Sequence, residues 1–248
     1  MKNGLGEISM LKKALVTGSA VGIGRAIALD LASKGFDVAF HYNQSAEAAK
    51  QGSEEAASHG VKSTALQADI TKPEQAKSLV ETAAEQLGGL SVVVNNVGNY
   101  LYKPIEQVSV EEWHQIIDSN LNCTFYVTQA IIPYLKAAGW GRIVNFAFAT
   151  AQHLIADNRQ TAYRIAKTGI IIYTKSLAKE LIKDKITANV VSPGVAENSI
   201  GLEETIPLLP TKRPATLKEI SDAVGFFISP EADYITGQNL EVAGGLRL

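Results

Sequence analysis

The chain has 248 residues, 46% hydrophobic and 19% charged, so it can bury a large core without disulfides or metals. Its formal net charge of −2 argues against a nucleic-acid-binding protein, which would carry a basic footprint. The single cysteine, Cys123, excludes an internal disulfide, and no apolar run reaches the ~18 residues of a membrane span.

Residues 1–10 carry no long apolar stretch, so we expect a short polar leader rather than a signal peptide, and a cytoplasmic protein. Cys123 lies in an apolar helical run, where it is expected to be a core residue. The histidines show no zinc-binding spacing, and we expect no metal. We expect each of them to be solvated or to cap a helix: His41, His59, His114 and His153.

Short apolar strands alternate with helical segments over residues 11–248. The expected strands cover 12–18, 36–42, 61–69, 90–96, 141–147, 186–192 and 238–244. The expected helices cover 23–35, 46–60, 71–87, 109–138, 160–183 and 216–229, and capping-box patterns precede three of them, at TKPE (71–74), SVEE (109–112) and TLKE (216–219). This alternation predicts one α/β domain, a Rossmann-like doubly wound parallel sheet of about seven strands with helices on both faces.

The region 196–215 has no clear periodicity and contains Pro207, Pro210 and Pro214. We expect it to be a substrate lid, and an inert surface loop is the alternative.

A glycine-rich turn, TGSAVGIG (17–24), follows the first expected strand and begins the first expected helix. Without side chains, Gly18, Gly22 and Gly24 allow a tight turn and a close approach of the backbone to a pyrophosphate. The helix N-terminus adds free N–H groups and a partial positive charge for the phosphates. Since the turn opens the first βαβ unit, it indicates a dinucleotide site.

The spacing TGxxxGxG is similar to that of the short-chain dehydrogenase/reductase family, and the resemblance extends from Leu11 to Leu248. It recurs in NNVG (95–98), in YxxxK at 163–167, in the proline–glycine pair 193–194 and in ITGQ (235–238). Val97 departs from the alanine usual in the family, and Asn198 stands where the family often has threonine. The resemblance implies cofactor contacts at Thr17, Gly18, Gly22, Ile23, Gly24, Asp69, Ile70, Asn96, Gly98, Tyr163, Lys167, Pro193 and Gly194.

The end of the second expected strand bears on the choice between NAD and NADP. A carboxylate there would bind the ribose 2′-hydroxyl and repel a 2′-phosphate. The sequence instead has Asn43, Gln44 and Ser45, which are neutral hydrogen-bonding residues. We therefore expect NADP(H) rather than NAD(H).

Tyr163 and Lys167 stand four apart in an expected helix, which places them on one face. A nearby ammonium, helped by an oxidised nicotinamide, would stabilise the phenolate and lower the pKa of Tyr163. By resemblance, Tyr163 transfers the proton at the carbonyl or alcohol oxygen, and Lys167 also holds the nicotinamide ribose. The resemblance also implies that Asn120 holds a water linking Lys167 to solvent.

The segment VNFAFATAQ (144–152) lacks a serine that the family usually has there for the substrate carbonyl. Counting forward from Val144 places Ala147 and Phe148 at the usual serine positions. Counting back from Tyr163 places Thr150 near the usual separation of about a dozen residues. Either the donor is lost, or Thr150 replaces it, with His153 or a lid residue as a further substitute. Loss of one donor to a developing oxyanion typically costs about 10²–10³ in rate.

Three functions remain open. The first is an NADP-dependent carbonyl reductase similar to 3-oxoacyl-acyl-carrier-protein reductases, acting on a small substrate that could be carrier-bound. The second resembles pteridine reductases, and the third is a non-catalytic dinucleotide-binding sensor without the serine. By resemblance we expect a homotetramer or homodimer formed through the helices flanking the fifth strand and through the last strand, with neither nucleic acid nor membrane as a partner.

Overall fold

The computed structural model describes residues 11–246, so the expected leader 1–10 lies outside the described residues. Within the described range, seven parallel strands form one sheet in the order β3-β2-β1-β4-β5-β6-β7. They are β1 (Lys13–Val16), β2 (Asp37–Tyr42), β3 (Ser63–Gln67), β4 (Val92–Asn95), β5 (Gly141–Phe146), β6 (Ile186–Pro193) and β7 (Asn239–Val242). The predicted Rossmann-like, doubly wound sheet is thereby confirmed.

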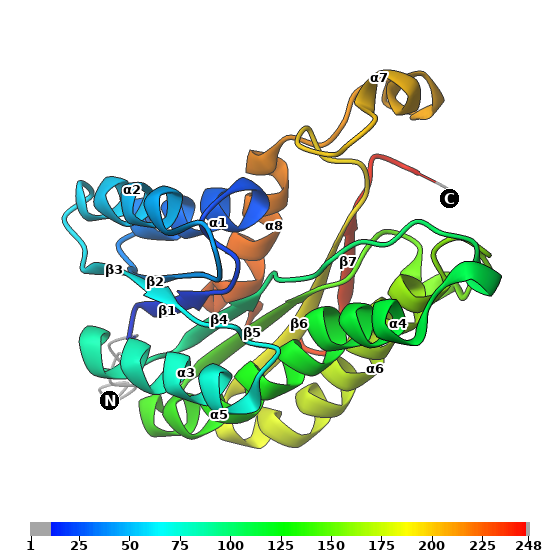
Figure 1. Cartoon of the computed structure of the whole chain (residues 1–248). Coiled ribbons are helices and arrows are strands. Elements are labelled where there is room, and N and C mark those ends of the chain that lie inside the picture. Colours follow the sequence, from blue (N-terminus) through cyan, green and yellow to red (C-terminus); the bar gives the residue numbers. More distant parts are fainter. Residues whose placement is uncertain (1–10, 247–248) are drawn as a thin grey trace, which may run out of the picture.

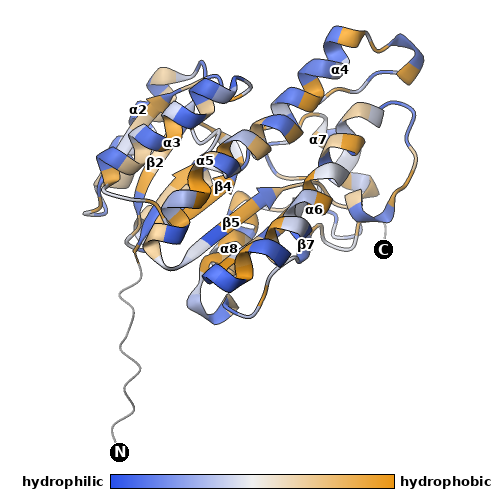
Figure 2. Cartoon of the chain, turned by 90° about the horizontal axis from the view of Figure 1, so that it is seen from below, coloured by the Kyte–Doolittle hydropathy of each residue, from blue (hydrophilic) through white to orange (hydrophobic). Residues whose placement is uncertain are grey.

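Helices cover both faces of this sheet (Figure 1). One layer contains α1 (Gly22–Ser33), α2 (Ala46–Ala57) and α8 (Leu217–Ile228), and the other contains α3 (Pro73–Leu87), α5 (Cys123–Ala138) and α6 (Thr161–Leu181). Two apolar cores fill the spaces between the sheet and these layers. Figure 2 shows the apolar residues concentrated in the strands and on the helix faces turned towards them. Cys123 is buried in one of these cores, as predicted.

The strand order reverses direction between β1 and β4, which are hydrogen-bonded neighbours. In open parallel sheets, ligands bind beside the carboxyl ends of the strands at such a switch point. The glycine-rich turn follows β1, NNVG lies at the end of β4, and the segment 147–150 follows β5. The fold therefore brings the predicted motifs together at the carboxyl ends of the strands.

The expected helix 109–138 is interrupted. It consists of α4 (Val110–Ile117), a π-helical turn at Asp118–Asn122, and α5. The π-helical turn contains Asn120, which the sequence singled out as a site residue. A π-helical turn inside a longer helix frequently marks a functional position.

Two of the three capping-box predictions are confirmed, because Ser109 and Thr216 each accept a hydrogen bond from the backbone N–H three residues on. The prediction at Thr71 is wrong. The α3 helix has Lys72 as its N-cap residue, without a side-chain cap. The Thr71 hydroxyl instead donates to Asp69 Oδ1 at 2.6 Å, so it is not free to cap the helix.

The segment 196–215 contains a short α-helix, α7 (Leu202–Thr205), followed by a 3₁₀ turn at Ile206–Leu208. The α7 helix projects from the body of the molecule (Figure 1). Among residues 11–246, no helix has the length and apolar character needed to cross a membrane.

Candidate cofactor and catalytic site

The glycine-rich turn has the backbone that the sequence predicts. Gly18 has φ +63°, a left-handed conformation that disfavours residues with a side chain. A Cβ on Gly24 would lie well under 3.0 Å from the carbonyl oxygen of Gly18. Helix α1 starts at Gly22 with no side-chain cap, so its first N–H groups are available to an anion. Ile23, in the same turn, packs partly against the core.

His41, on β2, supports this turn from beneath. Its Nδ1 accepts a hydrogen bond from the Gly18 N–H at 3.0 Å, and its Nε2 lies 3.0 Å from the carbonyl oxygen of Ala68. Because one ring nitrogen must accept and the other must donate, these partners fix the neutral tautomer with the proton on Nε2. Burial lowers the pKa of His41, against smaller opposing effects of Ala68 and Asp69.

The expectation that His41 is solvated or caps a helix is therefore wrong, because its side chain is 2% exposed. Strand β2 lies inside a parallel sheet covered on both faces, where a buried polar group requires partners. That context was the signal in the sequence that could have identified His41 as a structural part of the site.

Polar side chains tie the ends of β1 and β4 together. Thr17 Oγ1 accepts from the N–H groups of Asn96 and Val97 at 3.0 and 3.3 Å. The Asn96 amide donates to the carbonyl oxygens of Thr17 and Gly18, each at 3.2 Å. Thr17 and Asn96 thus tie the end of β4 to the glycine-rich turn.

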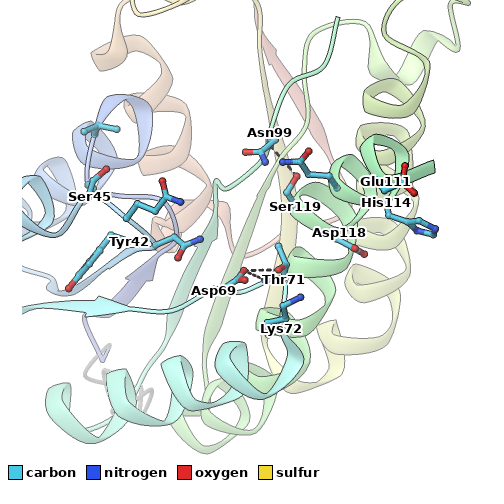
Figure 3. Close-up of a pocket in the computed structure, with 16 residues that line it drawn as sticks. Tyr42, Ser45, Asp69, Thr71, Lys72, Asn99, Glu111, His114, Asp118 and Ser119 are labelled. Carbon is cyan, nitrogen blue, oxygen red and sulfur yellow. Dashed lines mark hydrogen bonds between the residues drawn. The ribbon is translucent and has the colours of Figure 1, made fainter. Parts of the chain in front are cut away.

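A cleft of about 820 Å³ lies beside the glycine-rich turn, between the end of β2, the end of β3 and helix α4. Figure 3 shows Asp69, Thr71 and Lys72 on one side of it and Tyr42 and Ser45 on another. Asn43, Gln44 and Ser45 line it together, and the stretch 42–45 brings no carboxylate. Ile70 does not join them, because its side chain is 4% exposed and packs in the core under α3.

Tyr163 and Lys167 lie one turn apart on α6, as predicted. Lys167 Nζ donates to the carbonyl oxygen of Phe146 at 2.9 Å and lies 5.7 Å from the centre of the Tyr163 ring. Burial lowers the pKa of Lys167 to about 8. Burial also raises the pKa of Tyr163, with a smaller contribution from Tyr100. These two causes act in the protein alone, and the expected lowering of the Tyr163 pKa, which includes an oxidised nicotinamide, stays a prediction.

Asn120 lies next to this pair. Its Nδ2 donates to the carbonyl oxygens of Asn99 and Ile116 at 2.9 and 3.0 Å. Its Oδ1 is buried without a partner in the described part of the chain. A Cβ on Gly98 would clash with this oxygen and would lie 3.1 Å from Lys167 Nζ. The absence of a side chain at Gly98 therefore leaves the space that the Asn120 amide oxygen occupies beside Lys167.

The structure places Phe148, rather than Thr150, against the ring of Tyr163. The rings of Phe148 and Tyr163 have centroids 5.5 Å apart. Thr150 is 2% exposed, and its backbone N–H donates to Glu241 Oε1 on β7 at 3.0 Å. Its φ of +73° is unusual for a β-branched residue. Within residues 11–246 its hydroxyl makes no hydrogen bond and is not tied up by the protein, so the ring contact of Phe148 with Tyr163 is the observation that favours the forward count, with Phe148 at the serine position.

The loop after β6 packs against the segments that follow β5 and β7. Pro193 ends β6 and accepts a hydrogen bond from the Ala149 N–H at 2.8 Å. A Cβ on Gly194 would lie 3.0 Å from the Cα of Ala243, so the two loops are closely packed. Asn198, at the start of the expected lid, comes within 2.7 Å of where a Cβ on Gly22 would stand. The start of the segment 196–215 therefore reaches the glycine-rich turn.

Comparison with known proteins agrees with this arrangement. A family model described as enoyl-(acyl carrier protein) reductase matches residues 18–247. The 3-oxoacyl-acyl-carrier-protein reductase of Staphylococcus aureus (strain Mu50) is 35% identical over 246 residues, with 96% of this chain and 99% of that protein covered. The structure of acetoin dehydrogenase from Salmonella typhimurium is 32% identical, with a TM-score of 0.87 over 95% of this chain and 96% of that one. The structure of a short chain dehydrogenase from Burkholderia cenocepacia J2315 in complex with NADP is 30% identical, with a TM-score of 0.89 over 95% of this chain and 98% of that one.

Proposed function

We propose that this chain, which belongs to the short-chain dehydrogenase/reductase family, interconverts a carbonyl group and an alcohol with NADP(H) as its cofactor. Membership makes the chain an oxidoreductase that uses a nicotinamide dinucleotide. The observation that carries the proposal is the buried Lys167 ammonium, held at the end of β5 one helical turn from Tyr163.

The residues at the carboxyl ends of the strands fit this cofactor. The glycine-rich turn and the free N–H groups of α1 would hold the pyrophosphate, and the cleft beside Asp69 would hold the adenosine. When bound, the nicotinamide supplies or accepts the hydride at the substrate carbon. Further contacts with the cofactor would come from Asn96, Pro193 and Gly194, at the ends of β4 and β6.

Tyr163 would give its phenol proton to the carbonyl oxygen during reduction and take it back during oxidation. Lys167 would stabilise the resulting phenolate and bind the nicotinamide ribose. Asn120 would orient a water between its free Oδ1 and Lys167 Nζ, which provides a route for the replacement proton. The positive charges of Lys167 and of an oxidised nicotinamide act against the burial that raises the pKa of Tyr163.

The first experiment measures NADPH consumption with 3-oxoacyl thioesters, activated diketones and a pterin, for the wild type and Tyr163→Phe. We expect turnover in the wild type and a loss of at least about 10² in the variant, because proton transfer contributes 10²–10⁴. The replacement of the usual serine by Phe148 favours the competing function, a non-catalytic dinucleotide-binding sensor. Tight NADPH binding with equal background rates in both proteins would establish the sensor instead.

The preference for NADP rests on the end of β2, where Asn43, Gln44 and Ser45 face the cleft without a carboxylate. The Burkholderia relative in complex with NADP supports it. Asn43→Asp would introduce the missing carboxylate without changing shape, and we expect it to weaken NADPH binding but not NADH binding. Gln115→Glu, on the α4 side of the same cleft, is the matched control and should not discriminate between the cofactors. Tighter binding of NADH than NADPH by the wild type would contradict the proposal.

A homotetramer or homodimer remains a prediction. Three exposed apolar residues on α5 and α6 support it, because these helices flank β5: Phe125, Ile165 and Ile172 are 43%, 47% and 64% exposed. Light scattering after gel filtration would give the mass, and a monomer at micromolar concentration would contradict the prediction. The cytoplasmic location is likewise a prediction, to be checked by cell fractionation.

A further inference from the structure

Aromatic rings enclose the phenol of Tyr163 on two sides. The Tyr100 ring meets it edge-on, with centroids 5.1 Å apart and an interplanar angle of 85°. The Phe148 ring lies 5.5 Å away at 42°. Tyr100 in turn stacks on Tyr102, with centroids 6.5 Å apart and an angle of 17°. We call Tyr100, Tyr102 and Phe148 the aromatic wall.

Two guanidinium groups hold this wall in place. Arg164 lies 4.9 Å from the centre of the Phe148 ring, and Arg159 lies 5.5 Å from that of Tyr102. Arg164 is itself 9% exposed and donates to the carbonyl oxygen of Ile155 at 3.2 Å. Phe148 is therefore fixed between a buried cation and the catalytic tyrosine.

Arg164 and Arg159 pack on the aromatic wall, and its two tyrosines remain exposed to a ligand. Tyr100, which contacts Tyr163, and Tyr102, which stacks on Tyr100, are each 57% exposed. Tyr100 also borders a hollow of about 270 Å³ shared with Leu101 and Ile116.

The wall also changes what the site can do for a carbonyl group. With Phe148 at the expected serine position, the ring offers contact area but no hydrogen bond to the carbonyl oxygen. A substrate must then be oriented by its shape, and its carbonyl must be reactive without that donor. Conjugated 1,2-dicarbonyl compounds with an aromatic ring satisfy both requirements, because their flat faces stack on aromatic rings and the adjacent carbonyl activates the reacting one.

We propose that this chain selects a planar aromatic dicarbonyl substrate, with Tyr100 and Phe148 as the specificity-determining residues. The proposal rests on the proposed carbonyl–alcohol function and narrows its substrate class. A flexible 3-oxoacyl chain presents no flat face to the wall and gains little from it.

The test compares two ligands that differ only in the ring, 1-phenylpropane-1,2-dione and 1-cyclohexylpropane-1,2-dione. Their dissociation constants are measured by calorimetry on protein saturated with NADP⁺, so that no reduction occurs. We expect the phenyl compound to bind about tenfold more tightly, since an aromatic pair contributes ~0.5–1.5 kcal/mol beyond its buried area and 1.4 kcal/mol is tenfold. Equal affinities would overturn the proposal.

Variants assign the preference to the wall. Tyr100→Leu and Phe148→Leu should each reduce the phenyl preference to about two- to threefold, since each removes one ring contact. Tyr234→Leu, which removes a fully exposed ring at 101% exposure outside the wall, should leave the preference unchanged. Because Tyr100 is exposed, its variant should fold, and NADPH binding checks this for both. A preference that persists in both wall variants would also overturn the proposal.

Activity separates this proposal from the proposed function. Turnover of an acetoacetyl thioester that depends on Tyr163, together with equal affinity for the two diketones, keeps the function and overturns the substrate class. Failure of every carbonyl compound to be reduced overturns the function, while the binding preference still decides whether the wall selects planar rings.

Discussion

The hydrogen bonds of His41 provide the sharpest test of how this site is held together. His41→Phe keeps a planar ring of similar size inside β2 but removes both polar atoms. It leaves the Gly18 N–H and the Ala68 carbonyl oxygen without their partner. An orphaned buried donor or acceptor costs ~1–3 kcal/mol, so the two together should lower the free energy of unfolding by about 2–6 kcal/mol.

The same change should weaken NADPH binding, because Gly18 lies in the turn that would hold the pyrophosphate. Urea denaturation measures the stability, and fluorescence titration measures the dissociation constant of NADPH. His59→Phe is the matched control, since His59 is exposed and the same substitution there should change neither quantity. If His41→Phe lies within about 0.5 kcal/mol of the wild type, the change is no larger than that of an ordinary surface substitution and the assigned role is refuted.

The pH dependence of stability provides a second readout from the same residue. Burial lowers the pKa of folded His41 below 6.5, whereas the unfolded chain retains the ordinary value. Between these two values the unfolded state binds more protons, so stability rises with pH and is lost as the pH falls below about 6.5. The one titratable group identified as acting on the ring is Asp69, whose charge opposes this shift. The stability gained between pH 5 and 7 should be smaller in His41→Phe, and equal slopes would contradict the argument.

Three further substitutions address the catalytic end. Gly98→Ala places a methyl group against Asn120 and 3.1 Å from Lys167 Nζ, so we expect kcat to fall by roughly tenfold or more with the fold intact, checked by steady-state kinetics and circular dichroism. Phe148→Ser restores a hydroxyl and should raise kcat for an unactivated ketone towards the 10²–10³ that one donor typically contributes; an unchanged rate would show that this position does not reach the carbonyl. Thr150→Val should leave kcat within about twofold, whereas a fall of ~10²–10³ would identify Thr150 as the donor.

The sequence predicted the parts of the site that depend on local spacing. The turn TGSAVGIG and the pair Tyr163–Lys167 occupy the expected places because a βα turn and one helical turn fix their geometry. The π-helical turn around Asn120 was not predicted, and neither were the hydrogen bonds that the Asn120 side chain donates to Asn99 and Ile116. Such partners come together only when the whole fold has formed.

His41 and Thr71 show that local sequence patterns do not reveal the hydrogen-bond partners of a side chain. His41 was expected to be solvated or to cap a helix, yet its partners come from two separate segments of the chain. Thr71 had a helix-capping pattern, yet Asp69 takes its hydroxyl. The count from Val144 and the count from Tyr163 disagreed about Phe148 and Thr150, and only the ring contact with Tyr163 distinguishes them.

The approach of Asn198 to Gly22 has a consequence for the kinetics of the reaction. The amide lies beside Gly22 in the turn proposed to hold the pyrophosphate, and we expect a bound cofactor to displace the start of the segment 196–215. A substrate that requires this segment in its rearranged position can bind productively only afterwards. We therefore expect compulsory order, with NADP(H) adding first and leaving last. Product inhibition should be competitive between NADP⁺ and NADPH and non-competitive between the alcohol and NADPH. A random-order pattern would contradict the expectation that cofactor binding rearranges this segment before the substrate binds.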